Sequence, residues 1–208
     1  RYINSKGKKL IGWDEILEGG LAPNAAVMSW RGTQGGITAA RLGHDVVMTP
    51  TSHCYFDYYQ GQPAAEPPSI GGFIPLRKVY EFEPIPAELT ADEAVHILGG
   101  QANLWAEYIA TPAHAEYMLF PRLAAMSEAL WSPPDKRDWT DFAARLPAQL
   151  ERYRRAGIRC AESAFNVVLA PKLDPETSTL TMDMSNEIGV PEIRYRTDGR
   201  NPDASSAL

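Results

Sequence analysis

Aromatic and charged side chains stand close together at four places within the first 107 residues, each time at the end of a short apolar segment. A flat aromatic ring beside a carboxylate suits a ligand that has an apolar face and several hydroxyl groups. A sugar fits that description, and one such pair would be weak evidence for it. The four groups are Trp13 with Asp14 and Glu15, Trp30 with Arg31, Tyr55 with Asp57, and Trp105 with Glu107.

Each group also has an ordinary structural explanation. A single tryptophan at a strand end is more often a packing residue, and a glutamate beside it is often stabilised by the dipole of a following helix. Four successive groups of the same kind are harder to explain by packing. For Trp105 and Glu107, a separation of two residues on a strand would point both side chains to the same side.

The elements that must position these groups alternate between strands and helices. Short apolar runs predict strands near residues 9–14, 25–30, 45–49 and 96–103. Apolar residues at helical spacing predict short helices near 33–43 and 75–84, one continuous helix over 112–131, and another from Asp138 or Thr140 to about Gly157. This order indicates an α/β fold with a parallel sheet, and in a (β/α)8 barrel the carboxyl ends of the strands build the active site.

Composition narrows the class of protein. The chain has 208 residues, 44% of them hydrophobic and 22% charged, which is typical of a globular protein. A formal net charge of -6, with no basic stripe, argues against a nucleic-acid partner, and no apolar run predicts membrane insertion. Cys54 and Cys160 lack metal-ligand spacing, so two unpaired thiols are expected, although a disulfide between them stays open.

Five motifs in order resemble glycoside hydrolase family 20, the β-N-acetylhexosaminidases. The resemblance covers roughly residues 1 to 165, and its motifs are "GWDEI", "VMSWRG", "MTPTSHCYFDYYQG", "KVYEFEP" and "GGQANLWAEY". It implies the C-terminal half of a (β/α)8 TIM barrel (strands 5-8) over residues 1–169. Residues 170–208, which end in "IRYRTDGRNPDASSAL", resemble the start of a C-terminal β-sandwich domain and are expected to form a truncated sandwich segment. The opening "RYINSKGKKL" looks like the tail of a helix, so a longer parent protein is expected.

The resemblance also implies roles for six residues. Tyr55 would hydrogen-bond the oxygen of the substrate's acetamido group, and Asp57 and Glu107 would bind distant sugar hydroxyls. The remaining three would wall the acetamido pocket, with the last of them also lying under the terminal sugar: Trp13, Trp30 and Trp105. The implied partners are glycans that contain N-acetylglucosamine or N-acetylgalactosamine, and no metal or organic cofactor is implied.

One motif of the family is missing. Its catalytic Asp-Glu pair sits in a His-x-Gly-Gly-Asp-Glu motif at the end of strand four, and this sequence contains no such motif. The Asp14-Glu15 pair follows Trp13 and matches strand five instead. The resemblance therefore implies a substrate-assisted, retaining mechanism for the parent enzyme, in which the acetamido oxygen is the nucleophile. It implies an inactive chain when residues 1–208 stand alone.

Two alternatives remain open. One is a non-catalytic N-acetylhexosamine-binding protein on the same barrel, and the other is an unrelated barrel enzyme whose tryptophans are core residues. Pocket geometry distinguishes the second: the family interpretation would fail if Trp13, Trp30 and Trp105 did not face one cavity. A half-barrel would expose sheet edges, so either a homo-oligomer that covers them or a poorly soluble chain is expected. The sequence does not indicate a compartment, and the family resemblance implies a periplasmic, secreted or lysosomal protein.

Overall fold

A four-stranded parallel sheet forms the N-terminal part of the protein. The computed structural model describes residues 2–190 and 192–208. Neighbours in the sheet follow chain order, β1-β2-β3-β4, and all three pairings are parallel. The strands are β1 (Ile11–Trp13), β2 (Ala26–Ser29), β3 (Val46–Met48) and β4 (Ile97–Gly100), which confirms all four predicted positions.

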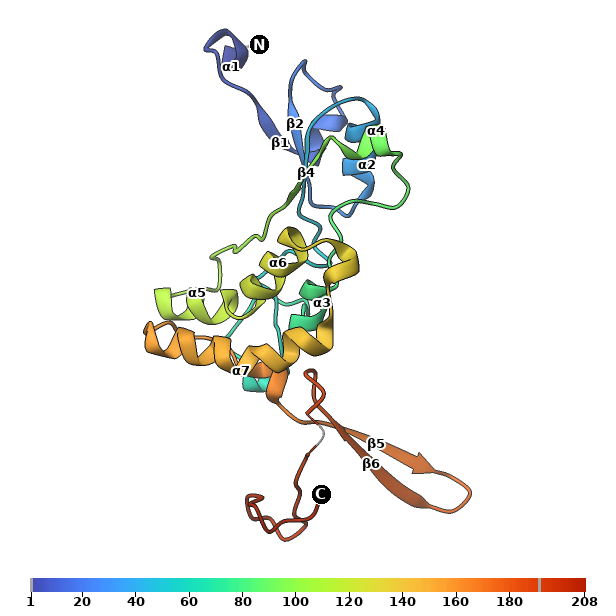
Figure 1. Ribbon diagram of the computed structural model, residues 1–208, viewed down its shortest axis with the longest axis vertical. Coiled ribbons are helices and arrows are strands. Elements are labelled where there is room, and N and C mark those ends of the chain that lie inside the picture. The colour runs from blue at the N-terminus through green and yellow to red at the C-terminus, as the bar shows by residue number, and fades with distance from the viewer. Residues whose placement is uncertain (1, 191) are drawn as a thin grey trace.

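Helices occupy one face of this sheet and continue below it (Figure 1). In the first turn of the helix after β2, Gly36 N donates a hydrogen bond to Ser29 Oγ at 2.8 Å. The helix ends before Gly43, whose φ is +76°. The helices are α1 (Tyr2–Ser5), α2 (Gln34–Arg41), α3 (Leu76–Tyr80), α4 (Ala91–Ala94), α5 (Pro112–Leu119), α6 (Arg122–Trp131) and α7 (Trp139–Arg155).

The prediction of one continuous helix over 112–131 was wrong. The chain forms α5 and α6 with a break at Phe120 and Pro121. Proline has no N–H to donate to the preceding turn, and it forces the residue before it toward an extended conformation. Phe120 is accordingly extended, with ψ at 135°. The break turns α6 so that it packs against α3.

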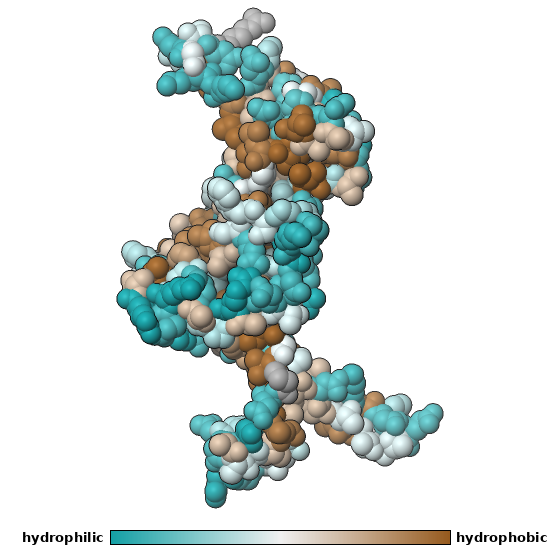
Figure 2. Space-filling model, viewed as in Figure 1, coloured by the Kyte–Doolittle hydropathy of each residue, from teal (hydrophilic) through white to brown (hydrophobic). Residues whose placement is uncertain are grey.

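The two faces of the sheet differ in burial. Val27, Val46 and Met48 are fully buried on the helix side. On the opposite side, Ile11 is 50% exposed and Leu98 is 62% exposed. Figure 2 shows hydrophobic residues gathered on the surface over the part of the molecule that holds the sheet. An apolar sheet face of this kind normally lies against another element.

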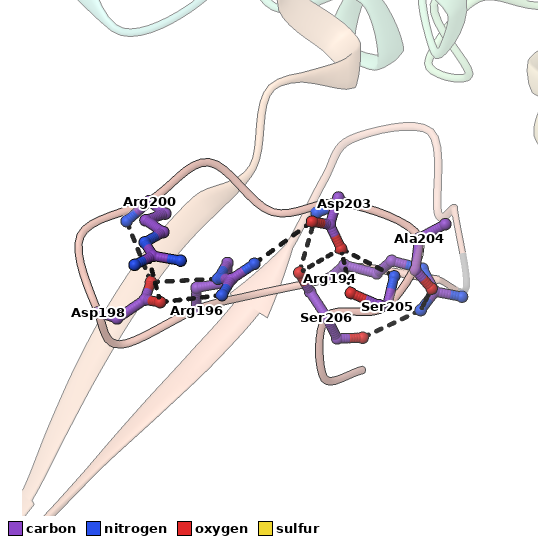
Figure 3. Close-up of polar contacts among 8 residues, drawn as sticks. All are labelled: Arg194, Arg196, Asp198, Arg200, Asp203, Ala204, Ser205 and Ser206. Atoms are coloured by element: carbon purple, nitrogen blue, oxygen red, sulfur yellow. Dashed lines mark hydrogen bonds and ion pairs between the residues drawn. The ribbon is translucent and has the colours of Figure 1, made fainter.

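The C-terminal segment separates from the helices as an antiparallel hairpin (Figure 1). It consists of β5 (Val168–Asp174) and β6 (Thr179–Ser185), and almost all of its residues are exposed. Further on, the chain turns at Asp198 and Gly199, where Gly199 has a φ of +78° and Arg200 N donates to Asp198 Oδ1 at 3.1 Å. Figure 3 shows the Arg196 guanidinium between Asp198 and Asp203, where it closes this turn with ion pairs of 2.9 and 3.3 Å.

Candidate active site

The segments that follow β1, β2, β3 and β4 line a single cleft of about 420 Å³. All six residues predicted from the sequence border it, so the strand ends bring them together as the barrel argument expects. The three tryptophans border this common cavity, so the condition under which the family interpretation would fail is not met. The lining comprises Trp13, Glu15, Trp30, Tyr55, Asp57, Tyr58, Ile70, Trp105 and Glu107.

Stacked and tilted aromatic rings form the walls of the cleft. The ring centroids of Trp13 and Trp105 are 5.7 Å apart, and those of Trp30 and Tyr55 are 6.3 Å apart with an interplanar angle of 30°. Tyr55 also contacts the ring of Tyr58, at 5.7 Å. Contacts of this kind hold each ring in a fixed orientation, so the cleft is rigid and apolar on most of its surface.

The Asp14-Glu15 pair positions the loop after β2. The buried Asp14 carboxylate accepts hydrogen bonds from the backbone N–H groups of Trp30, at 3.0 Å, and Arg31, at 3.1 Å, and from Arg31 Nε at 2.6 Å. Glu15 accepts from the indole Nε1 of Trp30, at 3.1 Å to each carboxylate oxygen. Both carboxylates are thus engaged with the Trp30 segment. Sequence reasoning found no role for them beyond their mismatch with the family's acid pair.

The chain after β3 is joined to the chain after β4 by backbone hydrogen bonds. Phe56 N donates to Asn103 O and Asn103 N donates to Cys54 O, both at 2.7 Å. The Asn103 side chain in turn donates to Thr49 Oγ1 at 2.6 Å. This short parallel bridge places Tyr55 and Asp57 next to Trp105 although about 50 residues separate them in sequence.

The reasoning that placed Trp105 and Glu107 on one strand face needs correction. β4 ends at Gly100, and both residues lie in the irregular segment beyond it. Gly99 has a φ of +137°, which ends regular strand geometry before the pair is reached. Both residues still border the cleft, so the loop rather than strand alternation brings them there.

Burial sets the electrostatics of the two acidic groups on the β3 loop. The Tyr55 side chain lies largely out of solvent, and burial raises the pKa of its phenol, so the hydroxyl remains a proton donor at neutral pH. Asp57 is 4% exposed, and burial raises the pKa of its carboxyl, with the nearby Glu107 charge adding to the rise. Within the described part of the chain, Asp57 Oδ1 is buried without a hydrogen-bond partner. A hydroxyl donor on a ligand would satisfy it.

Sequence analysis did not identify two of the lining residues, Tyr58 and Ile70. Tyr58 could have been suspected from its position next to Asp57. Ile70 lies in a Pro/Gly-rich stretch, and Ser69 brings it to the cleft by donating its hydroxyl to Asp57 O at 2.5 Å. Gly72, with a φ of +67°, lies so close to Tyr58 that an added Cβ would be 2.2 Å from its ring.

A larger groove, of about 570 Å³, lies between α6 and α7 and is away from the strand ends. None of the predicted site residues borders it. Over residues 2–190 and 192–208, no cluster of three or more His, Cys, Asp or Glu side chains could hold a metal ion. Cys54 and Cys160 are unpaired, as expected. No helix in the described ranges is long and apolar enough to cross a membrane.

Comparisons with known proteins relate the chain to one family. Residues 1–134 match the family model described as glycosyl hydrolase family 20, catalytic domain. The chain is 53% identical over 159 residues to a beta-hexosaminidase of Porphyromonas gingivalis, a match that covers 76% of this chain and 20% of that protein. It is 31% identical over 166 residues to a beta-N-acetylhexosaminidase of Cellulomonas fimi, covering 76% and 32% of the two chains.

A solved structure gives the same relationship. The exo-beta-N-acetylglucosaminidase of Vibrio harveyi in complex with N-acetylglucosamine superposes with a TM-score of 0.68 and 34% sequence identity. That match covers 77% of this chain and 26% of the other. The chain therefore spans only about a fifth to a third of the length of these relatives.

Proposed function

The chain belongs to glycosyl hydrolase family 20, and from that premise we propose that it forms the second half of the catalytic barrel of a β-N-acetylhexosaminidase. In this proposal β1 to β4 are the fifth to eighth strands of a (β/α)8 barrel. The exposed apolar face that carries Ile11 and Leu98 supports this arrangement, because it would form the barrel interior once the first four strands are present. Residues 170–208 would begin a separate β-sandwich domain, of which β5 and β6 form the first hairpin.

The proposed reaction is the hydrolysis of terminal, non-reducing N-acetylhexosamine residues with retention of configuration. The acetamido carbonyl oxygen of the substrate attacks C1, the C1–oxygen bond to the leaving group breaks, and an oxazolinium ion forms that water then opens. A narrow, rigid pocket must bend the acetamido group beneath the ring to reach this geometry. Trp13, Trp30 and Trp105 would supply its walls, supported by the ring contacts and by the hydrogen bond from Trp30 to Glu15.

Three polar residues would complete the substrate site. Tyr55 would donate its hydroxyl proton to the acetamido oxygen, a role that suits a phenol whose pKa burial has raised. Asp57 and Glu107 would accept hydrogen bonds from sugar hydroxyls. The buried, unpartnered Asp57 Oδ1 supports this role, because such an oxygen is costly unless a donor reaches it.

In this proposal the general acid lies outside these 208 residues. Asp14 and Glu15 are both held by the Trp30 segment, so neither is free to protonate a leaving oxygen. We expect the acid and its partner aspartate on the fourth strand of the complete barrel, within a His-x-Gly-Gly-Asp-Glu motif. The observation that carries the whole proposal is the convergence of four strand ends on one aromatic cleft.

The test uses the full-length protein and two aryl glycosides, one with an N-acetylamino group at C2 and one with a hydroxyl. Substrate assistance predicts turnover of the first only, and proton NMR of the released sugar should show the β-anomer first. Equal turnover of both glycosides, or initial release of the α-anomer, would exclude the mechanism.

A non-catalytic N-acetylhexosamine-binding protein is the second candidate. It is favoured because the residues proposed here would bind the sugar, and the cleaving pair is expected outside this sequence. Calorimetric binding of N-acetylglucosamine by the full-length protein, without turnover of the N-acetyl glycoside, would select this function.

A further inference from the structure

Arg122, near the start of α6, is the most deeply buried charged residue of the described chain, with 0% exposure. It makes no ion pair with any described residue, and its guanidinium lies over the ring of Phe56, with 4.8 Å from the guanidinium carbon to the ring centroid. Burying a charge in this way is costly unless all its hydrogen-bond donors are satisfied. Such a residue therefore needs a specific reason for its position.

All five donors of the guanidinium are used, and all go to backbone carbonyl oxygens. Nε and Nη2 donate to Met118 O, one turn away, at 3.2 and 2.8 Å. The other three bonds reach the loop after β3. Nη2 donates to Phe56 O at 2.5 Å, and Nη1 donates to Tyr58 O at 3.1 Å and to Ile74 O at 3.0 Å.

These three carbonyls define a clamp on the loop of residues 55–74. Phe56 and Tyr58 are the neighbours of Asp57 on either side, and Ile74 is the point where the loop returns to α3. The Arg122 side chain thus fixes the backbone on both sides of Asp57 and closes the loop at its base. Ile74 N also donates to Tyr59 O at 2.8 Å, which links the two ends directly.

We infer that Arg122 is a positioning residue of the active site, which holds the loop so that Tyr55 and Asp57 meet the substrate. The inference rests on the proposed function. Arg122 itself does not border the cleft. It acts through the backbone of the loop and through its charge.

Charged and titratable groups around the clamp are consistent with an effect of the Arg122 charge on Asp57. Burial raises the pKa of Asp57, Glu107 adds to the rise, and the Arg122 charge opposes it. Tyr55 and Tyr58 lie against Asp57 in the cleft, and Glu66, Glu187 and Tyr117 also face Arg122. Burial lowers the pKa of Arg122 to about 9, so it remains charged at neutral pH.

The experiment compares Arg122→Met and Arg122→Lys in the full-length enzyme. Methionine removes the donors and the charge, whereas lysine keeps the charge but has three donors instead of five. Both variants should raise KM for the N-acetyl glycoside about tenfold or more, because the hydroxyl contacts of Asp57 are displaced. Only Arg122→Met should also move the acid limb of the kcat/KM profile to higher pH, since an Asp57 without its neighbouring cation protonates sooner.

Two double variants assign that movement to Asp57. The shift caused by Arg122→Met should persist in a Glu107→Gln background and disappear in an Asp57→Asn background. Arg137→Met is the matched control, because Arg137 is also largely buried, at 11% exposure, and donates to the carbonyls of Phe82 and Ala129, away from the loop. It should lower stability and leave both KM and the acid limb unchanged.

Hydrogen exchange measured by mass spectrometry separates this inference from the proposed function. Both Arg122 variants should exchange faster than wild type over residues 55–74, and Arg137→Met should not. If the wild-type enzyme had no hexosaminidase activity, the proposed function would fail and exchange would decide the clamp alone. If Arg122→Met does not fold, Arg122→Lys still decides it: wild-type KM together with wild-type exchange over 55–74 would overturn the inference.

Discussion

Tyr55 is the residue for which the site makes the sharpest prediction. In the full-length enzyme, Tyr55→Phe keeps the ring that stacks on Trp30 and removes only the hydroxyl. A hydroxyl that aligns the acetamido oxygen matters most as charge develops, so the loss should appear in kcat, by about 10²–10³-fold, with little change in KM. The measurement is steady-state kinetics on an N-acetyl glycoside.

The control for this variant is a glycoside without the acetamido group. There the wild-type and Tyr55→Phe enzymes should have the same low rate. A Tyr55→Phe variant with near-wild-type kcat on the N-acetyl substrate would show that Tyr55 only packs against its neighbours.

For Glu15 the prediction is reversed: substitution should change KM more than kcat. Its carboxylate accepts a hydrogen bond from the Trp30 indole N–H, and Glu15→Gln should weaken this bond and leave Trp30 less well held. KM should rise severalfold, while kcat stays within a factor of about three. Kinetics of this one variant test the assignment of both residues. A fall in kcat of about 10³-fold would identify Glu15 as the general acid and displace the proposal that the acid lies on another strand.

Among the elements, the contact between α2 and the sheet depends on a glycine. A Cβ at Gly36 would lie 2.5 Å from Met48 Sδ and 3.1 Å from a Val46 methyl. Alanine normally stabilises a helix interior relative to glycine, but here overpacking should dominate. We expect Gly36→Ala to lower the free energy of unfolding by about 1–3 kcal/mol in urea denaturation.

Gly19→Ala provides the comparison for that experiment, because nothing lies within 4 Å of a Cβ at Gly19. It should leave stability within about 0.5 kcal/mol of wild type. A stabilised Gly36→Ala protein would mean that α2 sits farther from β3 than the structure places it.

The elements also show what the sequence could predict. The four strands were predictable because each is a short apolar run followed by polar residues, and the cleft followed from their parallel order. The break at Pro121 was visible in the sequence but was overridden by the apolar spacing of residues 118–130. The burial of Arg122 could not be predicted, because a charged residue within a helical pattern is normally solvent-exposed. Only the tertiary packing of the loop after β3 buries it.

At the scale of the whole molecule, the exposed sheet face determines how residues 1–208 should behave in isolation. Leu98 and Ile11 expose large apolar side chains there, and β1 and β4 leave two strand edges unpaired. Sedimentation velocity should therefore find self-association of the isolated chain that rises with concentration. Leu98→Lys should reduce it, whereas Leu42→Lys, directly after α2 and also exposed, should not. A monomer at high concentration would contradict this.

The isolated chain should also fail to hydrolyse an aryl N-acetylglucosaminide. In the proposed function the general acid is expected on the fourth barrel strand, and the His-x-Gly-Gly-Asp-Glu motif that carries it is missing from this sequence. Residues after 192 and the β5–β6 hairpin should exchange their amide hydrogens faster than β4, since the hairpin packs on little else. Exchange as slow in the hairpin as in β4 would mean that another part of the protein covers it.

The clamp made by Arg122 has a consequence for redesign. Its hydrogen bonds go to the backbone carbonyl oxygens of Phe56, Tyr58 and Ile74, and every amino acid has such an oxygen. The exposed side chains at 62–65 can therefore be exchanged without loss of these hydrogen bonds, whereas Gln60, Glu66 and Ser69 bond other segments and should be kept. Residues 62–65 can in this sense be replaced on a fixed backbone, and Ile70, in the lining of the cleft, is the position at which substitution would change substrate preference.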